Sequence, residues 1–122
     1  MYQQYKKETA LPTLIKRKSI QEKQVDKASI IGCYNFSTGA YDTVEGSFNG
    51  IHGTMMNNRS TKTYYIVSGT ATFEIDEKTY DVEKGDILSV EPKSWLKIIG
   101  RDLKTLIITN PPFDPNDEEW KV

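Results

Sequence analysis

Apolar and polar residues alternate along most of the chain, and this pattern predicts strands. From residue 30 onward, short apolar runs are broken by glycine, asparagine and aspartate. No stretch shows the sustained period of three to four residues that an amphipathic helix requires. Residues 70–75 alternate strictly, as a half-buried strand does. The other strands that the pattern predicts are 63–67, 79–82, 87–90, 95–99 and 103–109, so we expect an all-β domain.

The order of these segments also predicts how the chain is organised. Many short strands with regular turns favour a sandwich or a small barrel, because closure protects the sheet edges. Residues 11–15 contain a proline and β-branched residues, which predicts an N-terminal edge strand that two subunits could exchange. The prolines within 110–115 end the sheet, since proline donates no ladder hydrogen bond. We expect an N-terminal arm at 1–28, a β-barrel at 29–113 and an acidic tail at 114–122.

Composition narrows the possible partners. Sixteen Lys and Arg residues against seventeen Asp and Glu leave a net charge of −1, so no strongly basic field favours nucleic acid. The sequence contains neither a membrane-spanning apolar run nor a signal peptide. The single cysteine, Cys33, cannot form an intramolecular disulfide, which favours a reducing compartment. We therefore expect a cytoplasmic protein with no nucleic-acid and no membrane partner.

Two glycine-containing segments carry a family resemblance. From Gly50 to Gly69 the spacing resembles the first motif of the cupin superfamily, in which two histidines and a glutamate lie between the glycines. From Gly85 onward the chain resembles the second motif, and residues 65–69 and 110–113 are similar to a strand and to the exit segment of the family. The resemblance covers residues 50–113. It implies a single-domain, cupin-type double-stranded β-helix, which is a jelly-roll barrel.

The positions that the resemblance assigns to metal ligands carry other residues. Met56 and Asn58 stand where the family has histidines, and Lys62 stands where it has glutamate. The histidine position of the second motif is occupied by Leu96. A thioether and an amide are weak donors for iron, manganese or zinc, and an ammonium group brings positive charge to the place of the cation. We predict no bound metal and no other cofactor.

Strand alternation places several of these residues in one direction. If the pleat is regular, that direction is the barrel interior implied by the resemblance, and the residues concerned are Met56, Asn58, Lys62, Tyr64 and Ile66. Inside a cavity, Lys62 could hold an anionic ligand or act as a base. At the mouth of the barrel it would instead pair with Glu91 or Glu74. Both interpretations of Lys62 stay open.

His52 is the only histidine and the candidate catalytic residue, together with Tyr64. An imidazole is suited to general acid or base catalysis near neutral pH, and His52 and a tyrosine could exchange protons with a substrate. However, His52 lies between Gly50 and Gly53, and a glycine-flanked stretch also fits an exposed loop. The sequence assigns no carboxylate or second histidine to orient the ring.

The remaining candidates are ligand contacts. Trp95, together with Phe48, Tyr64 and Trp120, could form an aromatic wall for a sugar ring or a flat ligand, although core packing is the simpler explanation of these residues. Arg59, beside two asparagines, could bind a sugar or phosphate or belong to an ordinary turn. The complete set of predicted ligand-binding residues is Met56, Asn58, Arg59, Lys62, Tyr64, Glu91, Trp95 and Leu96.

Three functions follow as hypotheses. The first is a metal-free cupin-fold protein that binds a small polar or anionic molecule, such as a carbohydrate derivative or a metabolite, without catalysis. The second is a metal-independent sugar isomerase or epimerase that uses His52 and a tyrosine. The third is an interaction module with a filled barrel. Because cupin-like barrels commonly pair through their sheets, the resemblance also implies a homodimer.

Overall fold

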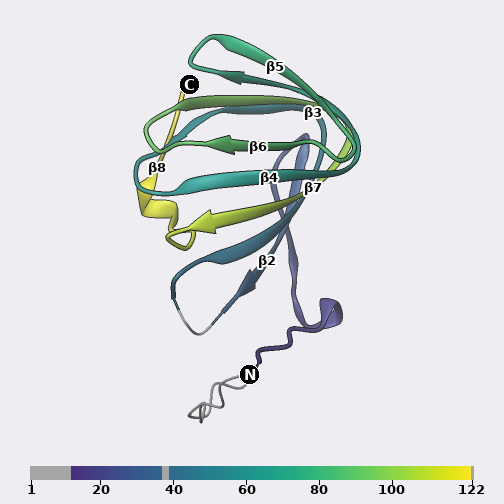
Figure 1. The fold of residues 1–122 in the computed structure, drawn as a ribbon, viewed down its shortest axis with the longest axis vertical. Coiled ribbons are helices and arrows are strands. Elements are labelled where there is room, and N and C mark those ends of the chain that lie inside the picture. Colours follow the sequence, from purple (N-terminus) through teal and green to yellow (C-terminus); the bar gives the residue numbers. More distant parts are fainter. Residues whose placement is uncertain (1–11, 37–38, 122) are drawn as a thin grey trace, which may run out of the picture.

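The computed structural model describes residues 12–36 and 39–121, and strands dominate them. Figure 1 shows these strands stacked around one interior, and the predicted all-β jelly roll is confirmed. None of the described helical segments is long and apolar enough to cross a bilayer. The elements are η1 (Arg17–Ser19), β1 (Glu22–Asp26), β2 (Ser29–Asn35), β3 (Asp42–Asn57), β4 (Thr61–Ile75), β5 (Lys78–Glu83), β6 (Ile87–Val90), β7 (Trp95–Asn110), η2 (Pro115–Asp117) and β8 (Glu118–Trp120).

Three long strands form the centre of the barrel. β7 pairs with β3 on one side and with β4 on the other, and all pairings are antiparallel. β2 and β1 continue the sheet from β3, while β5 and β6 both pair with β4. The sequence pattern predicted separate strands at 63–67 and 70–75 and again at 95–99 and 103–109. In the structure each of these pairs is one strand that bends midway, β4 and β7 respectively.

The bends of the three long strands lie side by side. In the pairing with β7, the register of β3 shifts between Phe48 and Gly50, and the register of β4 shifts on both sides of Ser68. Gly69 has a φ of 78°, and a Cβ at this position would overlap the carbonyl oxygen of Asp102 in β7. Only glycine tolerates both conditions at low cost. This explains why Gly69 resembles a motif glycine, and it shows that this glycine serves the fold.

Bulges also decide which side chains face the interior. Along β3 the buried residues have even numbers up to His52, but an irregularity between His52 and Met55 changes the alternation. Met55 and Asn57 are therefore buried, at 4% and 7% exposure. The predicted inward direction of Met56 and Asn58 is wrong, because a one-residue shift exchanges the two faces of a strand. On β4 no bulge intervenes before Ile66, and the direction predicted for Lys62 and Tyr64 is confirmed.

The N-terminal segment differs from the strand that was expected there. Residues 12–16 form no strand and Leu14 is 77% exposed, whereas Leu11 lies outside the described residues. The N-terminal edge strand is β1, which pairs with β2 and with no other strand of the described residues. The acidic tail folds back after η2, and β8 pairs with residues 55–57 of β3. This segment is drawn in yellow at one end of the barrel in Figure 1.

Candidate functional site

A cavity of about 70 Å³ lies inside the barrel between the central strands and the two edge strands β1 and β8. Its wall is largely apolar, and the polar side chains that line it are His52, Lys62, Tyr64, Thr109 and Glu118. An outer pocket of about 790 Å³ adjoins the cavity. The two spaces share Val25, Ile31, Cys33, Phe113, Glu118 and Trp120. A small molecule can therefore approach the inner polar groups through a partly aromatic entrance.

His52 lies in the cavity wall and not in an exposed loop. Its exposure is 7%, and its ring lies between those of Phe48 and Trp120, with centroid distances of 5.2 and 5.3 Å. The Nδ1 atom is 2.8 Å from Asp26 Oδ2 and 2.9 Å from Ser29 Oγ. Nε2 has no hydrogen-bond partner among the described residues. The loop interpretation of His52 is therefore wrong, and its free ring nitrogen is available to a ligand.

Asp26, at the end of β1, sets the tautomer of His52. Partial burial by itself would raise the pKa of this carboxyl, but hydrogen bonds from Ser29, the Ala28 N–H and His52 together lower the pKa below its ordinary value. An ionised carboxylate only accepts hydrogen bonds. Nδ1 of His52 therefore carries the proton and donates a hydrogen bond to Asp26. Nε2 is then the unprotonated nitrogen of the neutral ring. This is the arrangement that a general base requires.

Burial also keeps His52 uncharged. Desolvation lowers the pKa of the imidazole below its ordinary value, although the contact with Asp26 acts in the opposite direction. Lys62 lowers the pKa further and Glu118 raises it, so both groups are within electrostatic reach of the ring. A histidine with a lowered pKa is neutral at physiological pH, when its Nε2 can accept a proton.

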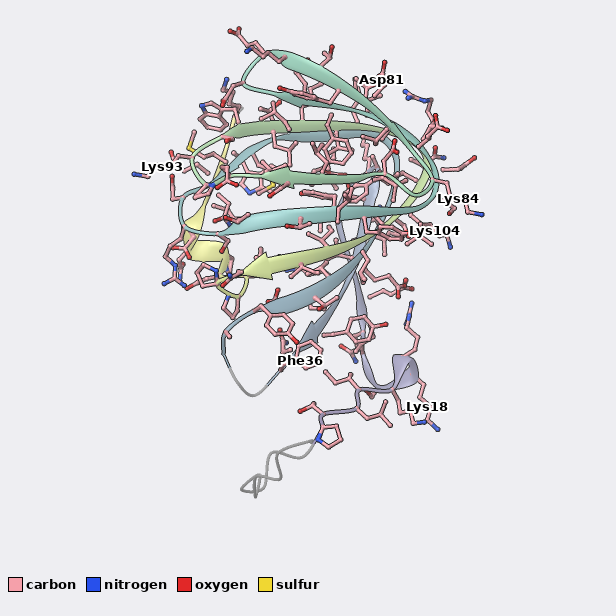
Figure 2. All side chains as sticks on the ribbon, viewed as in Figure 1. Lys18, Phe36, Asp81, Lys84, Lys93 and Lys104 are labelled. Atoms are coloured by element: carbon pink, nitrogen blue, oxygen red, sulfur yellow. The ribbon has the colours of Figure 1, made fainter. Side chains whose placement is uncertain are left out.

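Lys62 forms a second carboxylate contact in the cavity. Its Nζ is 2.9 Å from Glu118 Oε2, and the two side chains are only 12% and 8% exposed. Other lysines, such as the labelled Lys93 and Lys104, project away from the barrel in Figure 2. The predicted partners of Lys62 were Glu91 or Glu74, but its partner is Glu118 of β8. The sequence could not predict this pair, because strand pairing brings together residues that are far apart in the chain.

Tyr64 precedes the bend of β4 and faces the same cavity. It is 3% exposed and its ring contacts Phe73 edge-on, at a centroid distance of 5.0 Å. Burial, together with the nearby negative charge of Glu118, raises the pKa of the Tyr64 hydroxyl well above its ordinary value. The hydroxyl is therefore protonated at all physiological pH values and can donate a hydrogen bond.

The other predicted ligand contacts do not reach this cavity. Leu96 and the exposed Glu91 border a separate space of about 10 Å³ on another side of Lys62. Trp95 faces outward, where Lys121 Nζ lies 4.6 Å from the centre of its ring. Asn58 and Arg59 bind the C-terminal segment from outside, through Glu119 at 2.8 Å and Asp117 at 3.0 Å. Met56 pairs with Trp95 and Glu119 across the sheet and does not line the cavity.

Sequence reasoning missed two carboxylates and understated one aromatic residue. Asp26 was not singled out, and the acids of the tail were counted only as charge. Glu118 and Trp120 are two residues apart, which is the spacing of side chains on one face of a strand. That alternation was the only signal in the tail, and three residues are too few to predict a strand.

Comparison with known proteins identifies the family. The cupin domain family model matches residues 49–108. Pac13 from Streptomyces, described as a nucleoside dehydratase, has a similar structure, with a TM-score of 0.83 and 20% identity over 91% of this chain and 92% of its own. The chain is a member of the cupin superfamily.

Two further comparisons are more distant or cover less of the sequence. KdgF from Halomonas sp. has a TM-score of 0.75 and 12% identity over 87% of this chain and 99% of its own. MJ1618, an uncharacterized protein of Methanocaldococcus jannaschii, is 36% identical over 63 residues, which are 49% of this chain and 50% of that protein. This chain thus spans about half the length of that curated relative. At their low identities, the structural neighbours establish the fold only.

The metal site that cupins often carry does not fit the residues present. In the described part of the chain, no three His, Cys, Asp or Glu side chains are grouped as a metal ion would need. Lys62 occupies a motif ligand position, points into the cavity and is paired with Glu118. The other motif positions hold a thioether, an amide and an alkyl group, which are poor donors for the metals of this family. The groups available for chemistry in this cavity are therefore its own side chains.

Proposed function

We propose that this cupin is an enzyme that moves protons on a small polar molecule without a metal, with His52 as the base. The observation that carries the proposal is the Asp26–His52 pair in the wall of a cavity that reaches solvent. A metal-independent isomerase or epimerase needs a carboxylate that orients its histidine, and the sequence alone assigned none. Asp26 fills this role. The cavity itself supports a ligand-binding role over that of a filled interaction module.

The proposed steps follow from the two sides of the cavity. A bound molecule places a carbon-bound or hydroxyl proton against Nε2 of His52, which accepts it. The imidazolium that forms is stabilised by the hydrogen bond from Nδ1 to Asp26. Tyr64, which remains protonated, donates a hydrogen bond to an oxygen atom of the substrate, and the imidazolium returns its proton to another atom of the substrate or to the hydroxyl group that leaves as water. Isomerisation, epimerisation and loss of water all fit this sequence of proton transfers.

The fold neighbours suggest where to look for a substrate. Pac13 is described as a nucleoside dehydratase, and structures of its variants contain uridine. Nucleosides carry a flat base and a polyhydroxylated sugar, which suit an aromatic entrance at Trp120 and Phe113 and a polar interior. We therefore propose neutral nucleosides and monosaccharides as the first substrates to test. The homodimer and the cytoplasmic location remain predictions.

The test has two stages. Native mass spectrometry and elemental analysis of protein purified without added metal or chelator would identify a retained ligand and measure metal. The nucleosides and monosaccharides are then incubated with the protein in deuterated water, and exchange of carbon-bound protons or loss of water is followed by NMR and mass spectrometry. We expect turnover in the metal-free protein, and a loss of about 100-fold or more in His52→Gln.

Matched controls separate catalysis from binding. Tyr64→Phe should reduce turnover, whereas Tyr65→Phe, at the next residue and on the exposed outer face, should not. Turnover that His52→Gln leaves unchanged would refute the proposal. A retained ligand that shows no exchange would favour a binding protein, and a stoichiometric metal required for turnover would contradict metal independence.

A further inference from the structure

The Lys62–Glu118 pair has a consequence for the kind of ligand that the cavity accepts. We propose that Glu118 acts as a built-in anion that occupies the binding position of Lys62, so that the cavity selects uncharged ligands and excludes anionic ones. This inference rests on the proposed function only in taking the cavity as the ligand site. It assigns a specificity-determining role to a residue of the C-terminal strand.

The first argument is the charge of the cavity wall. Lys62 is the only Lys or Arg among the described residues that line it, and its Nζ is 2.9 Å from a carboxylate oxygen of Glu118. Asp42, a further carboxyl that interacts electrostatically with Lys62, is 2% exposed. His52 is neutral, as shown above. An arriving anion would therefore find no unpaired cation in the cavity.

The second argument is the cost of displacing Glu118. An anionic ligand that took its place on Lys62 would leave the Glu118 carboxylate without its partner beside the apolar cavity wall. Separating a buried ion pair is strongly unfavourable, because the remaining charge has neither water nor a counter-ion. An uncharged hydroxyl or carbonyl group carries no such cost. It can bind beside the pair and leave the contact intact.

The third argument is that β8 is held on both sides of Glu118. Before it, the N–H of Asn58 donates to the Asp117 carbonyl at 2.8 Å, and Arg59 is 3.0 Å from the Asp117 carboxylate. After it, the N–H of Lys121 donates to the carbonyl of Thr54 at 2.9 Å. The Glu118 backbone cannot withdraw from the cavity without breaking these contacts. Glu118 is thus a fixed part of the cavity wall.

The experiment compares acetate with acetamide, two probes of nearly the same shape that differ in charge. Binding is followed at constant ionic strength through the NMR signals of the His52 ring, which belong to the only histidine in the chain. We expect wild-type protein to bind acetamide about tenfold or more tightly than acetate. In Glu118→Gln, acetate should become the tighter ligand. Glu119→Gln is the matched control, since its side chain contacts Asn58 outside the cavity, and its preference should equal that of the wild type.

Each result supports or overturns the inference. Wild-type protein that binds acetate as tightly as acetamide, or shows no saturable binding of acetamide, overturns it, and this measurement stands even if Glu118→Gln fails to fold. A folded Glu118→Gln protein that does not gain acetate binding overturns it as well. The readout is binding without turnover, so it is independent of whether His52 transfers protons.

Discussion

The two edge strands beside the cavity, β1 and β8, each bring one carboxylate to a basic side chain, but the two contacts have different consequences. Asp26 is 2.8 Å from His52 Nδ1, and Glu118 is 2.9 Å from Lys62 Nζ. Asp26 is 27% exposed and orients a ring that burial keeps neutral. Glu118 is 8% exposed and compensates an ammonium group away from water. Similar distances therefore describe a base-orienting contact in one case and a charge-neutralising contact in the other.

The central strands and the edge strands supply different groups to the site. The central strands β3 and β4 supply basic and hydroxyl side chains of the cavity, namely His52, Lys62 and Tyr64. The edge strands supply the carboxylates that set their tautomer or charge. The difference between the two edges predicts that their variants will not be equally destabilising.

The largest effect is expected at the β8 side. Lys62→Met removes the cation and leaves Glu118 buried without a partner, which should lower the free energy of unfolding by about 3–5 kcal/mol. Urea denaturation at neutral pH measures this change. The double variant Lys62→Met/Glu118→Met should recover much of the loss, because it leaves no buried charge. A single variant as stable as the wild type would show that Glu118 is not an isolated charge in the absence of Lys62.

A smaller effect is expected at the β1 side. Asp26→Asn removes a charged hydrogen-bond acceptor from a neutral ring, which should cost about 1–3 kcal/mol. Because Asp26 opposes the effect of burial on His52, its loss should lower the pKa of His52 further. An NMR titration of the single histidine measures the pKa of His52 in the wild type and in the variant. A higher pKa in the variant would contradict the proposed contact.

The pH dependence of stability follows from the same pKa shift. Since the pKa of His52 is lower in the folded than in the unfolded protein, the unfolded state binds the proton first. Stability should therefore fall as the pH decreases below about 6.5, the ordinary histidine value, until the folded pKa is passed. Urea denaturation between neutral and acidic pH should show this loss, and His52→Gln should remove it. An unchanged slope in the variant would assign the loss to other groups.

The smallest effect is expected at the outer anchor of β8. Arg59 is 59% exposed where it meets Asp117, so water screens the pair. Arg59→Ala should change the free energy of unfolding by less than about 1 kcal/mol. Thermal denaturation measures it, and the acetamide preference of the cavity should be unchanged. A loss as large as that of Lys62→Met would mean that water does not screen the Arg59–Asp117 pair.

The sequence by itself determined the fold class and the direction of one strand. Alternation and turn residues predicted an all-β domain, because both depend on neighbouring residues and on local backbone geometry. The resemblance of residues 50–113 to the cupin motifs implied the type of barrel. The inward direction of Lys62 and Tyr64 followed from simple alternation, since no bulge separates them. The poor metal-donor chemistry at the motif positions could also be read directly from the residues.

Only the tertiary structure decided the composition of the site. One extra residue between His52 and Met55 reversed the predicted direction of Met56 and Asn58, and local propensity does not encode such a bulge. The contact of Asp26 with His52 depends on how β1 and β2 extend the sheet from β3. Glu118 reaches Lys62 because β8 pairs with β3 across more than fifty residues of sequence. Contacts between segments so far apart are set by the packing of the whole barrel.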